Sequence, residues 1–331
     1  MNSYRAAIVG CGSISSVHAA AVKENGAELC AVCDIKPERA HALSEKTGAA
    51  AYTLFEQMLK AEKINVLHVC TPHFLHLPMS EAALARGINV VLEKPPVMNM
   101  KEFQSLSEAE KSGNVQLCVC FQNRFNATTV HAKKLIDSGK YGALLGARGI
   151  VTWNRRGAYY TESGWRGRYD TEGGSVLINQ ALHTLDLLGG FLGEPTDVRA
   201  VCANLSHSEI ETEDTVCAEI DYGGKNAVFY STVSACKSPC AEIMLFCKRA
   251  NINLSFRECA VYPEDEKPEI FSVSDITPGK SCWGSSHSEL IGKFYSSLDK
   301  SGNEQNPCPL ESCRGTMDAM CRIYSGGLIT V

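Results

Sequence analysis

The chain has 331 residues, a formal net charge of −5 and a hydrophobic content of 44%. That length is too great for one typical hydrophobic core and favours about two domains, and the composition is ordinary for a globular protein. The mild acidity gives no electrostatic reason to expect nucleic acid or an anionic membrane surface as a partner. No apolar run approaches the roughly 18 residues of a spanning helix. The first residues, MNSYRAAIVGCG, lack the layout of a signal peptide, so we expect a cytoplasmic protein.

The chain also contains 16 cysteines, most of them inside apolar runs. Free cysteine behaves there as a small buried hydrophobe, so we expect reduced thiols and a reducing compartment. Cys30 and Cys33 have CxxC spacing, but in a strand their side chains point to opposite faces. Because no second CxxC completes a zinc set, we expect no metal site.

The first 120 residues alternate short β-rich runs with helical patterns. The expected strands are 5–9, 28–33, 66–70, 88–92 and 115–120, with a weaker one near Ala51. The expected helices are 13–24, 37–47, 74–86 and 100–112. This alternation predicts right-handed βαβ units, and hence an α/β Rossmann domain over residues 1–122.

The pattern changes from about Gly142. A helix over 175–188 is followed by expected strands at 197–204, 215–222, 227–234, 241–247 and 252–256, and by helices at 286–298 and 311–325. Turn pairs such as Gly223-Gly224 favour antiparallel neighbours. Residues 123–331 are therefore predicted to form an α+β domain for substrate binding and oligomerisation, with an open, mainly antiparallel sheet. The last helix is a candidate to pack back on the first domain.

The run Gly10-Cys11-Gly12-Ser13-Ile14-Ser15 directly follows the first strand and opens the first helix. Gly10 permits a tight turn, and Gly12 lets a pyrophosphate approach the backbone at the helix N-terminus, beside Ser13 and Ile14. Asp34 ends the second strand, where a carboxylate accepts hydrogen bonds from ribose hydroxyls and repels a 2′-phosphate. We therefore expect NAD as the cofactor, with NADP less favoured, although Lys36 weakens that preference.

Two further polar segments lie at the carboxyl ends of strands, where ligands bind in open α/β sheets. They are Thr71-Pro72-His73 and Glu93-Lys94-Pro95. A residue before proline is excluded from the helical region, so Lys94 is held extended at the mouth of the sheet. The bond between Lys94 and Pro95 is a candidate for cis geometry.

A mostly apolar helix between Gly173 and Gly190 carries three polar residues, namely Asn179, His183 and Asp186. Helical positions separated by four and then three residues return to nearly one line, so the three are predicted to form one polar stripe. The stripe faces either water or a group that needs hydrogen bonds and a titratable imidazole.

Together these segments resemble the Gfo/Idh/MocA family, the group of glucose-fructose oxidoreductase and inositol dehydrogenase. The matching motifs are Gly10-Cys11-Gly12…His18, Thr71-Pro72…His76, Glu93-Lys94-Pro95 and Gly173-Gly174…Asn179…His183…Asp186. The resemblance implies hydride transfer between a nicotinamide and a secondary alcohol of a sugar, glycoside or inositol. It implies Lys94 and His183 as catalytic residues, the imidazole acting as base and the ammonium supplying positive charge. It also implies cofactor contacts from Thr71, Pro72, His73, His76, Glu93, Lys94 and Gln122.

This sequence departs from the family pattern at one position. Many members carry aspartate four residues before the histidine, whereas this chain has Asn179, which can hold a sugar hydroxyl but cannot accept a proton. Asp186 is expected either to orient the imidazole of His183 beside the substrate or to hydrogen-bond backbone locally. His287 and Arg124 also resemble family positions, the first near the cleft and the second a candidate structural residue.

An aromatic and arginine-rich run extends from Trp153 to Tyr169. Aromatic faces stack on sugar rings, and arginine offers a planar fork of donors to hydroxyls or carboxylates. Tyr160, Trp165 and Arg166 are the expected substrate contacts. Packing between subunits is the rival interpretation, because interfaces use the same residue types.

Two other functions remain open for this sequence. One is an NAD-dependent glycosidase or lyase that oxidises a sugar carbon only transiently and then returns the hydride. The other is a non-catalytic, NAD-bound sensor, against which the presence of both Lys94 and His183 argues. A homodimer or homotetramer is expected from the resemblance alone.

Overall fold

The computed structural model describes residues 4–273, 286–299 and 303–330, which divide into two compact units. The first unit comprises Met1–Phe121 and Ser286–Cys313, and the second comprises Gln122–Ser285 and Arg314–Val331. The first unit is therefore discontinuous in sequence. Helix α9 (His287–Ser297) returns to it, whereas α10 (Arg314–Ser325) is grouped with the second unit.

The first unit is built on a parallel sheet with strand order β3-β2-β1-β4-β5-β6. Its strands are β1 (Arg5–Val9), β2 (Glu28–Cys33), β3 (Ala50–Tyr52), β4 (Val66–Val69), β5 (Asn89–Leu92) and β6 (Leu117–Val119). β1, β4 and β5 are buried almost throughout, as expected for parallel strands covered on both faces. At the far edge, Val119 donates its N–H to the carbonyl oxygen of Cys308, so the returning segment pairs with β6.

The helices of this unit complete right-handed crossovers. They are α1 (Ser15–Glu24), α2 (Pro37–Thr47), α3 (Phe55–Ala61), α4 (His76–Leu84) and α5 (Met100–Gly113), with the short turn η1 (His73–Leu75) before α4 and η4 (Leu310–Cys313) at the end of the returning segment. Because the crossovers from β1 and from β4 run in opposite directions along the sheet, their helices cover opposite faces. α1 packs against α9, and α4 packs against α5. The predicted Rossmann fold is confirmed.

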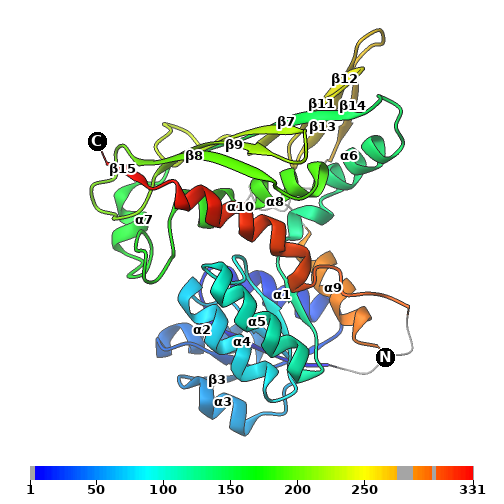
Figure 1. The fold of residues 1–331 in the computed structure, drawn as a ribbon. Coiled ribbons are helices and arrows are strands. Elements are labelled where there is room, and N and C mark those ends of the chain that lie inside the picture. Colours follow the sequence, from blue (N-terminus) through cyan, green and yellow to red (C-terminus); the bar gives the residue numbers. More distant parts are fainter. Residues whose placement is uncertain (1–3, 274–285, 300–302, 331) are drawn as a thin grey trace. The chain divides into compact units, whose positions relative to one another are not determined.

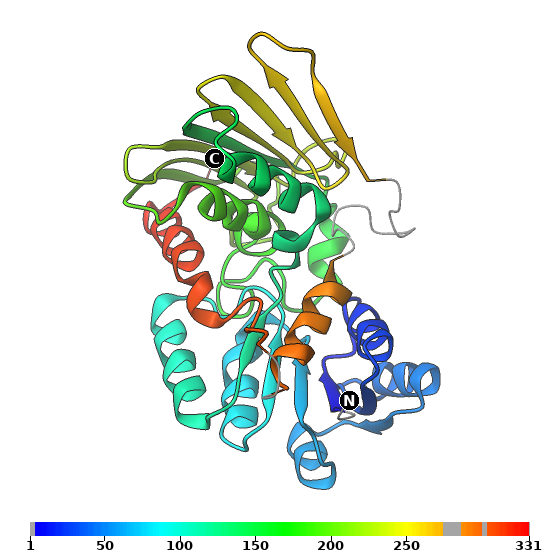
Figure 2. The same cartoon turned by 90° about the vertical axis from the view of Figure 1, so that its right-hand side faces the viewer.

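The second unit contains a nine-stranded sheet with order β14-β13-β12-β11-β7-β10-β9-β8-β15 (Figure 2). Its strands are β7 (Leu144–Thr152), β8 (Asp197–Asn204), β9 (Thr215–Asp221), β10 (Asn226–Thr232), β11 (Glu242–Cys247), β12 (Ala250–Leu254), β13 (Glu258–Pro263), β14 (Glu269–Ser272) and β15 (Leu328–Thr330). The β10–β7 and β15–β8 pairs are parallel and the other pairs are antiparallel, which confirms the predicted mainly antiparallel sheet.

One face of this sheet is covered by helices (Figure 1). They are α6 (Ala127–Asp137), α8 (Leu182–Leu192) and α10, which pack against β13, β7 and β8 respectively. The remaining short elements are η2 (Gln122–Phe125), α7 (Gly157–Thr161) and η3 (Val176–Ala181). Burial alternates along β10, with Ala227 and Phe229 buried and Val228 exposed between them, so the opposite face of the sheet is open.

The polar-striped helix is not a single α-helix. Val176–Ala181 forms a π-helical turn, and the regular helix α8 begins only at Leu182. Asn179 therefore lies in the π-turn, whereas His183 and Asp186 lie in α8. π-turns inside helices are frequent at functional sites.

Within the described residues, no helix combines the length and apolar character that crossing a membrane requires. The cysteines of those residues carry free thiols, and most are buried. Burial raises the pKa of Cys11 to about 12 and that of Cys33 to about 11, so both remain protonated at neutral pH.

Candidate active site

The turn after β1 requires glycine at its first position. Gly10 has φ of 88°, and a Cβ there would lie 2.5 Å from the carbonyl oxygen of Cys70. Its N–H donates to the carbonyl of Cys33 at 2.8 Å, which ties the turn to the end of β2. At Gly12, by contrast, a Cβ would meet no atom within 4 Å. The backbone is thus open in front of Gly12, as the approach of a pyrophosphate requires.

Asp34 is held beside this turn by backbone donors. Its Oδ2 accepts the N–H of Cys11 at 2.8 Å, and its Oδ1 accepts the N–H of Lys36 at 2.8 Å. Each oxygen keeps lone-pair capacity for a further donor. Ser13 is exposed and Ile14 partly exposed at the start of α1. These residues fit a dinucleotide, with the phosphates at the helix N-terminus and a ribose at Asp34.

His76 holds the segment after β4 through hydrogen bonds to the backbone. The buried imidazole lies between two carbonyl oxygens, with Nδ1 at 2.6 Å from Pro95 and Nε2 at 2.9 Å from Thr71. Burial lowers the pKa of His76, so the neutral ring donates to one of these oxygens at a time. His76 joins the turn after β4 to the turn after β5. His73 is also buried, and cofactor contacts from both histidines and from Thr71 and Pro72 stay predictions.

Lys94 follows the carboxyl end of β5, and its peptide bond to Pro95 is cis, as the sequence suggested. Its neighbour Glu93 points into the first unit. Oε1 of Glu93 lies 2.9 Å from Nε2 of His18 and 3.6 Å from Nε2 of His287. Burial opposes ionisation, but hydrogen bonds from these two histidines hold the pKa of Glu93 well below its ordinary value. The predicted cofactor contact of Glu93 stays a prediction.

The hydrogen bonds continue from His18 to the helix α9. Nδ1 of His18 lies 2.9 Å from Nδ1 of His68, and Nε2 of His68 lies 2.8 Å from the hydroxyl of Tyr295. Burial lowers the pKa of His68 well below its ordinary value, so that ring is neutral. One consistent assignment follows, in which Tyr295 donates to His68, His68 to His18, and His18 to Glu93. In this tautomer Nε2 of His18 has no lone pair to offer a metal ion.

In the second unit, a buried carboxylate holds the start of the π-turn. Glu213 accepts the backbone N–H groups of Ser175 and Leu177, each at 3.0 Å, and the hydroxyl of Tyr324 at 2.9 Å. The carboxylate thereby satisfies N–H groups that a helix start leaves without intrahelical partners. Gly174 has φ of 155°, and a Cβ there would overlap the Tyr324 hydroxyl. Close packing at this helix start thus explains the glycine at position 174.

His183 is partly exposed in the first turn of α8. Nε2 of Gln122, from η2, lies 3.3 Å from Nε2 of His183, and which group donates depends on the tautomer of the ring. Gln122 is buried, and its contact with His183 was not expected from the sequence. Its predicted cofactor contact stays a prediction.

Asp186 does not orient the imidazole. Its Oδ2 accepts from Nε of Arg124 at 2.8 Å, and its Oδ1 accepts from Nη2 of Arg124 at 2.6 Å and from the hydroxyl of Thr316 at 2.8 Å. This bidentate ion pair is buried on the carboxylate side. Neither expected role of Asp186, orienting the imidazole of His183 or bonding backbone locally, is seen, because a guanidinium offers a charged carboxylate two parallel donors. The predicted structural role of Arg124 fits these contacts.

Asn179 lies next to a carboxylate that sequence reasoning missed. Its Nδ2 donates to Oε1 of Glu172 at 2.5 Å, and Oε2 of Glu172 accepts the N–H of Gly167 at 2.6 Å. Burial raises the pKa of Glu172 to about 7, against the effect of these two hydrogen bonds. The aspartate absent from position 179 is therefore matched by a buried glutamate directly behind the asparagine. The only signal was an acidic residue before the Gly173-Gly174 pair.

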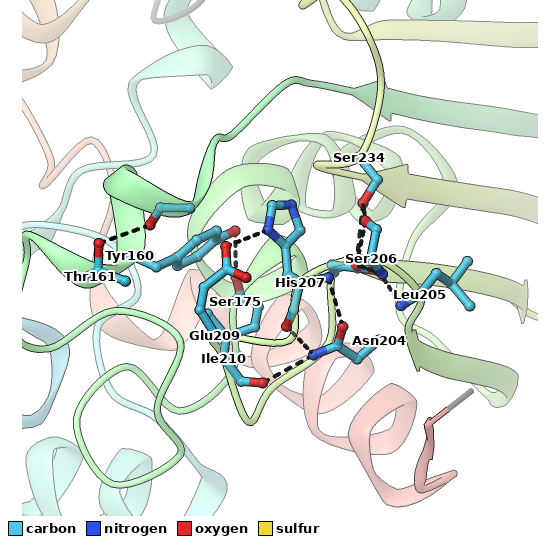
Figure 3. Close-up of polar contacts among 12 residues, drawn as sticks. Tyr160, Thr161, Ser175, Asn204, Leu205, Ser206, His207, Glu209, Ile210 and Ser234 are labelled. Atoms are coloured by element: carbon cyan, nitrogen blue, oxygen red, sulfur yellow. Dashed lines mark hydrogen bonds and ion pairs between the residues drawn. The ribbon is translucent and has the colours of Figure 1, made fainter.

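Of the three expected substrate contacts in the aromatic run, Tyr160 is the most enclosed. It is 3% exposed, and its hydroxyl accepts from Oγ of Ser175 at 3.0 Å (Figure 3). Its ring lies 5.3 Å from that of His207, whose Nδ1 is 2.9 Å from Glu209. These contacts describe a core residue, and substrate binding by Tyr160 stays a prediction. Trp165 and Arg166 are partly exposed.

The chain matches known families over both units. The profile described as "Oxidoreductase family, NAD-binding Rossmann fold" matches residues 4–121, and the profile of the GFO/IDH/MocA C-terminal domain matches residues 129–252. A D-glucoside 3-dehydrogenase from Escherichia coli is 34% identical over 215 residues, which are 63% of this chain and 59% of the relative. An inositol 2-dehydrogenase from Corynebacterium glutamicum is 25% identical over 229 residues, which are 67% of this chain and 65% of the relative. The matches thus span roughly three fifths to two thirds of these relatives.

Solved structures agree with this assignment. The WlbA dehydrogenase from Bordetella pertussis, in complex with NADH and UDP-GlcNAcA, has a TM-score of 0.87 and 26% identity, and the comparison covers 98% of this chain and 96% of that one. A levoglucosan dehydrogenase in complex with NADH and levoglucosan has a TM-score of 0.86 at 18% identity, covering 98% and 97% of the two chains, which shows a shared fold. With two domain profiles matched in order and a glycine turn shaped for a dinucleotide, this chain belongs to the Gfo/Idh/MocA family of NAD-binding oxidoreductases.

Proposed function

We propose that the protein transfers a hydride between NAD and a secondary alcohol of a sugar or polyol. The observation that carries this proposal is His183, a partly exposed imidazole at the start of α8, in a helix otherwise rich in leucine. The names of the relatives, which include glucoside, inositol and levoglucosan dehydrogenases, support the substrate class. Lys94, at the carboxyl end of β5 in the sheet that carries the glycine turn, supports the chemistry.

NAD, when bound, supplies the hydride acceptor. The protein has to remove the hydroxyl proton, because an alcohol is far too weak an acid to lose it at neutral pH. We assign this step to His183 and charge stabilisation of the alkoxide to the Lys94 ammonium. A base needs one ring nitrogen with a lone pair while the other keeps its proton. Gln122, whose side chain lies beside Nε2 of His183, is placed to influence which ring nitrogen carries the proton.

The test replaces each residue by alanine. Lys94→Ala and His183→Ala should each lower kcat at least 100-fold, the lower end of typical acid–base contributions. NADH affinity should stay within about twofold. His131→Ala, on α6, is the matched control and should keep full turnover. Unchanged turnover in either variant would remove that residue from the mechanism, and absence of any NAD reduction over a panel of sugars, glycosides and inositols would refute the proposal.

We propose that NAD is preferred to NADP. The preference is assigned to Asp34, whose carboxylate is held at the end of β2 by the N–H groups of Cys11 and Lys36. A fixed negative charge there accepts a 2′-hydroxyl and repels a 2′-phosphate. Fluorescence titration should show tighter binding of NADH than of NADPH. Asp34→Ser should reduce the difference in affinity between the two cofactors. Tighter NADPH binding by the unaltered protein would overturn this assignment.

We also propose that the protein is a homodimer or homotetramer that buries the open face of the nine-stranded sheet. By register, Val201, Val228, Phe246 and Tyr262 project from that face, and all are exposed. An apolar patch of this kind marks interaction surfaces. Light scattering should give a molar mass of two or four chains for the unaltered protein. The Val228→Lys variant should have a lower molar mass. A monomer at micromolar concentration would contradict the proposal.

A further inference from the structure

Two arginines lie over the ring of Tyr159. The guanidinium carbon of Arg166 lies 4.2 Å from the centroid of that ring, and the guanidinium carbon of Arg155 lies 5.0 Å from it. Arg155 also lies 4.9 Å from the ring of Trp153, and Arg166 lies 4.9 Å from the ring of Trp165. Each guanidinium group thus lies close to two aromatic rings, an arrangement that favours cation–π attraction and restricts its movement.

The hydrogen-bond partners of the Arg155 guanidinium are neutral. Arg155 donates to the side-chain carbonyl of Gln180 at 2.8 Å and to the backbone carbonyl of Asn154 at 3.4 Å. Nε of Arg155 and Nε of Arg166 are both buried and lack a hydrogen-bond partner. Across residues 4–273, 286–299 and 303–330, neither arginine forms an ion pair with a carboxylate. Charged donors that are buried without an acceptor are costly, so the pair is prepared for an anion.

The nearby carboxylates are already occupied. Glu172 interacts electrostatically with Arg166, but its two oxygens accept from Asn179 and from the N–H of Gly167. It supplies at most one negative charge against two positive ones. Arg168, in the same segment, differs in having its own carboxylate, because its Nε lies 3.2 Å from Asp170.

The arginine pair is connected to the proposed reaction site through Tyr159. The hydroxyl of Tyr159 accepts from Nε2 of Gln180 at 2.7 Å and lies 3.5 Å from Nδ2 of Asn179. Asn179 belongs to the π-turn that leads directly into α8 and His183. Tyr159 therefore contacts both the arginines and Asn179, the residue expected to hold the sugar.

We propose that Arg155 and Arg166 bind the carboxylate of an acidic sugar, so that the substrate is a uronic acid or a uronic acid glycoside. This inference rests on the proposed function and names its substrate class. A planar carboxylate matches the planar donor forks of guanidinium groups, and hydrogen bonds between charged partners are shorter and stronger than neutral ones. A neutral sugar would supply no negative charge opposite the two guanidinium groups.

The experiment compares methyl β-D-glucuronide with methyl β-D-glucoside, which differ in a carboxylate against a hydroxymethyl group. The unaltered protein should have a kcat/KM for the glucuronide at least tenfold higher. Arg155→Gln and Arg166→Gln should each lower kcat/KM for the glucuronide about 30-fold, within the range for hydrogen bonds to charged groups, and change that for the glucoside less than threefold. Arg166→Lys keeps the charge but loses the fork, and should give an intermediate loss. Arg168→Gln is the matched control and should leave kcat/KM unchanged for both sugars.

Equal activity on the two sugars, or equal losses on both in the glutamine variants, would overturn the inference. Higher kcat/KM for glucose 6-phosphate than for the glucuronide would overturn the carboxylate assignment. Calorimetry with glucuronate and saturating NADH separates the two proposals. One outcome is that no sugar is oxidised, that glucuronate binds and that Arg155→Gln abolishes the binding. This outcome would refute the proposed hydride transfer but support the proposed carboxylate site. If glucuronate does not bind, the acid site fails.

Discussion

Replacing Glu172 by glutamine should change how stability depends on pH. Glu172 is buried, and both its oxygens accept hydrogen bonds, from Nδ2 of Asn179 at 2.5 Å and from N–H of Gly167 at 2.6 Å. Burial raises its pKa from 4.5 to about 7. The native protein therefore keeps a proton on Glu172 over a pH window in which the unfolded chain has lost it.

The sign follows from that difference. Between pH 4.5 and 7 the native state binds more protons at this site than the unfolded state, so the free energy of unfolding falls as pH rises. The gap between those two values corresponds to about 3 kcal/mol at 1.36 kcal/mol per pH unit. The Glu172→Gln variant lacks this titration. Relative to the unaltered protein, the variant should gain about 3 kcal/mol on going from acid to neutral pH.

Urea denaturation followed by tryptophan fluorescence measures this difference, since Trp153 and Trp165 both belong to the second unit. Curves at half-unit steps from about pH 4.5 to 8 give the free energy of unfolding at each step. Glu162→Gln, an exposed carboxylate in the same segment, is the control and should run parallel to the unaltered protein. Parallel curves for Glu172→Gln over the whole window would refute the reasoning, because Glu172 would then titrate alike in both states.

Two further predictions concern fixed contacts. Gly10→Ala introduces a side chain at φ of 88° and 2.5 Å from the Cys70 carbonyl; it should weaken NADH binding at least tenfold by fluorescence titration and cost about 1–3 kcal/mol of stability. Gly190→Ala, where a Cβ meets nothing within 4 Å, should do neither. Arg124→Ala leaves the buried Asp186 carboxylate without its ion pair and should cost about 3–5 kcal/mol of stability in urea denaturation. Adding Asp186→Asn should recover part of that loss, and a purely additive double variant would contradict this account.

The sequence predicted the first unit closely, because its determinants are local. β1 and β2 have the predicted bounds, since each is an apolar run that ends at a glycine or an aspartate. The cis bond after Lys94 was also anticipated, because proline makes that geometry accessible. In the second unit, α6 was missed because ATTVHAKKLID is polar and contains β-branched residues with weak helical preference.

The partners of the site residues were harder to predict, because they come from distant segments. Spacing places Asp186 one turn from His183, but only the fold brings Arg124, 62 residues away, to its carboxylate. Glu172 lies outside the helix whose periodicity was considered, so its bond to Asn179 leaves no periodic signal. No characteristic amino-acid composition marks a π-turn. The capping of Ser175 and Leu177 by Glu213 depends on a residue 36 to 38 positions away.

The hydrogen-bonded chain from Tyr295 to Glu93 has a consequence for biosynthesis. Its members lie on β4, α1, the end of β5 and α9, and α9 is made almost 200 residues after β5 (Asn89–Leu92 against His287–Ser297). A ribosome adding about 5–20 residues per second has released most of the chain before that helix arrives. Until then, α9 cannot cover His68 or the part of the core against which it packs. The part of the first unit that precedes Gln122 therefore stays incomplete until α9 has been made, and nascent chains halted before α9 should bind chaperones.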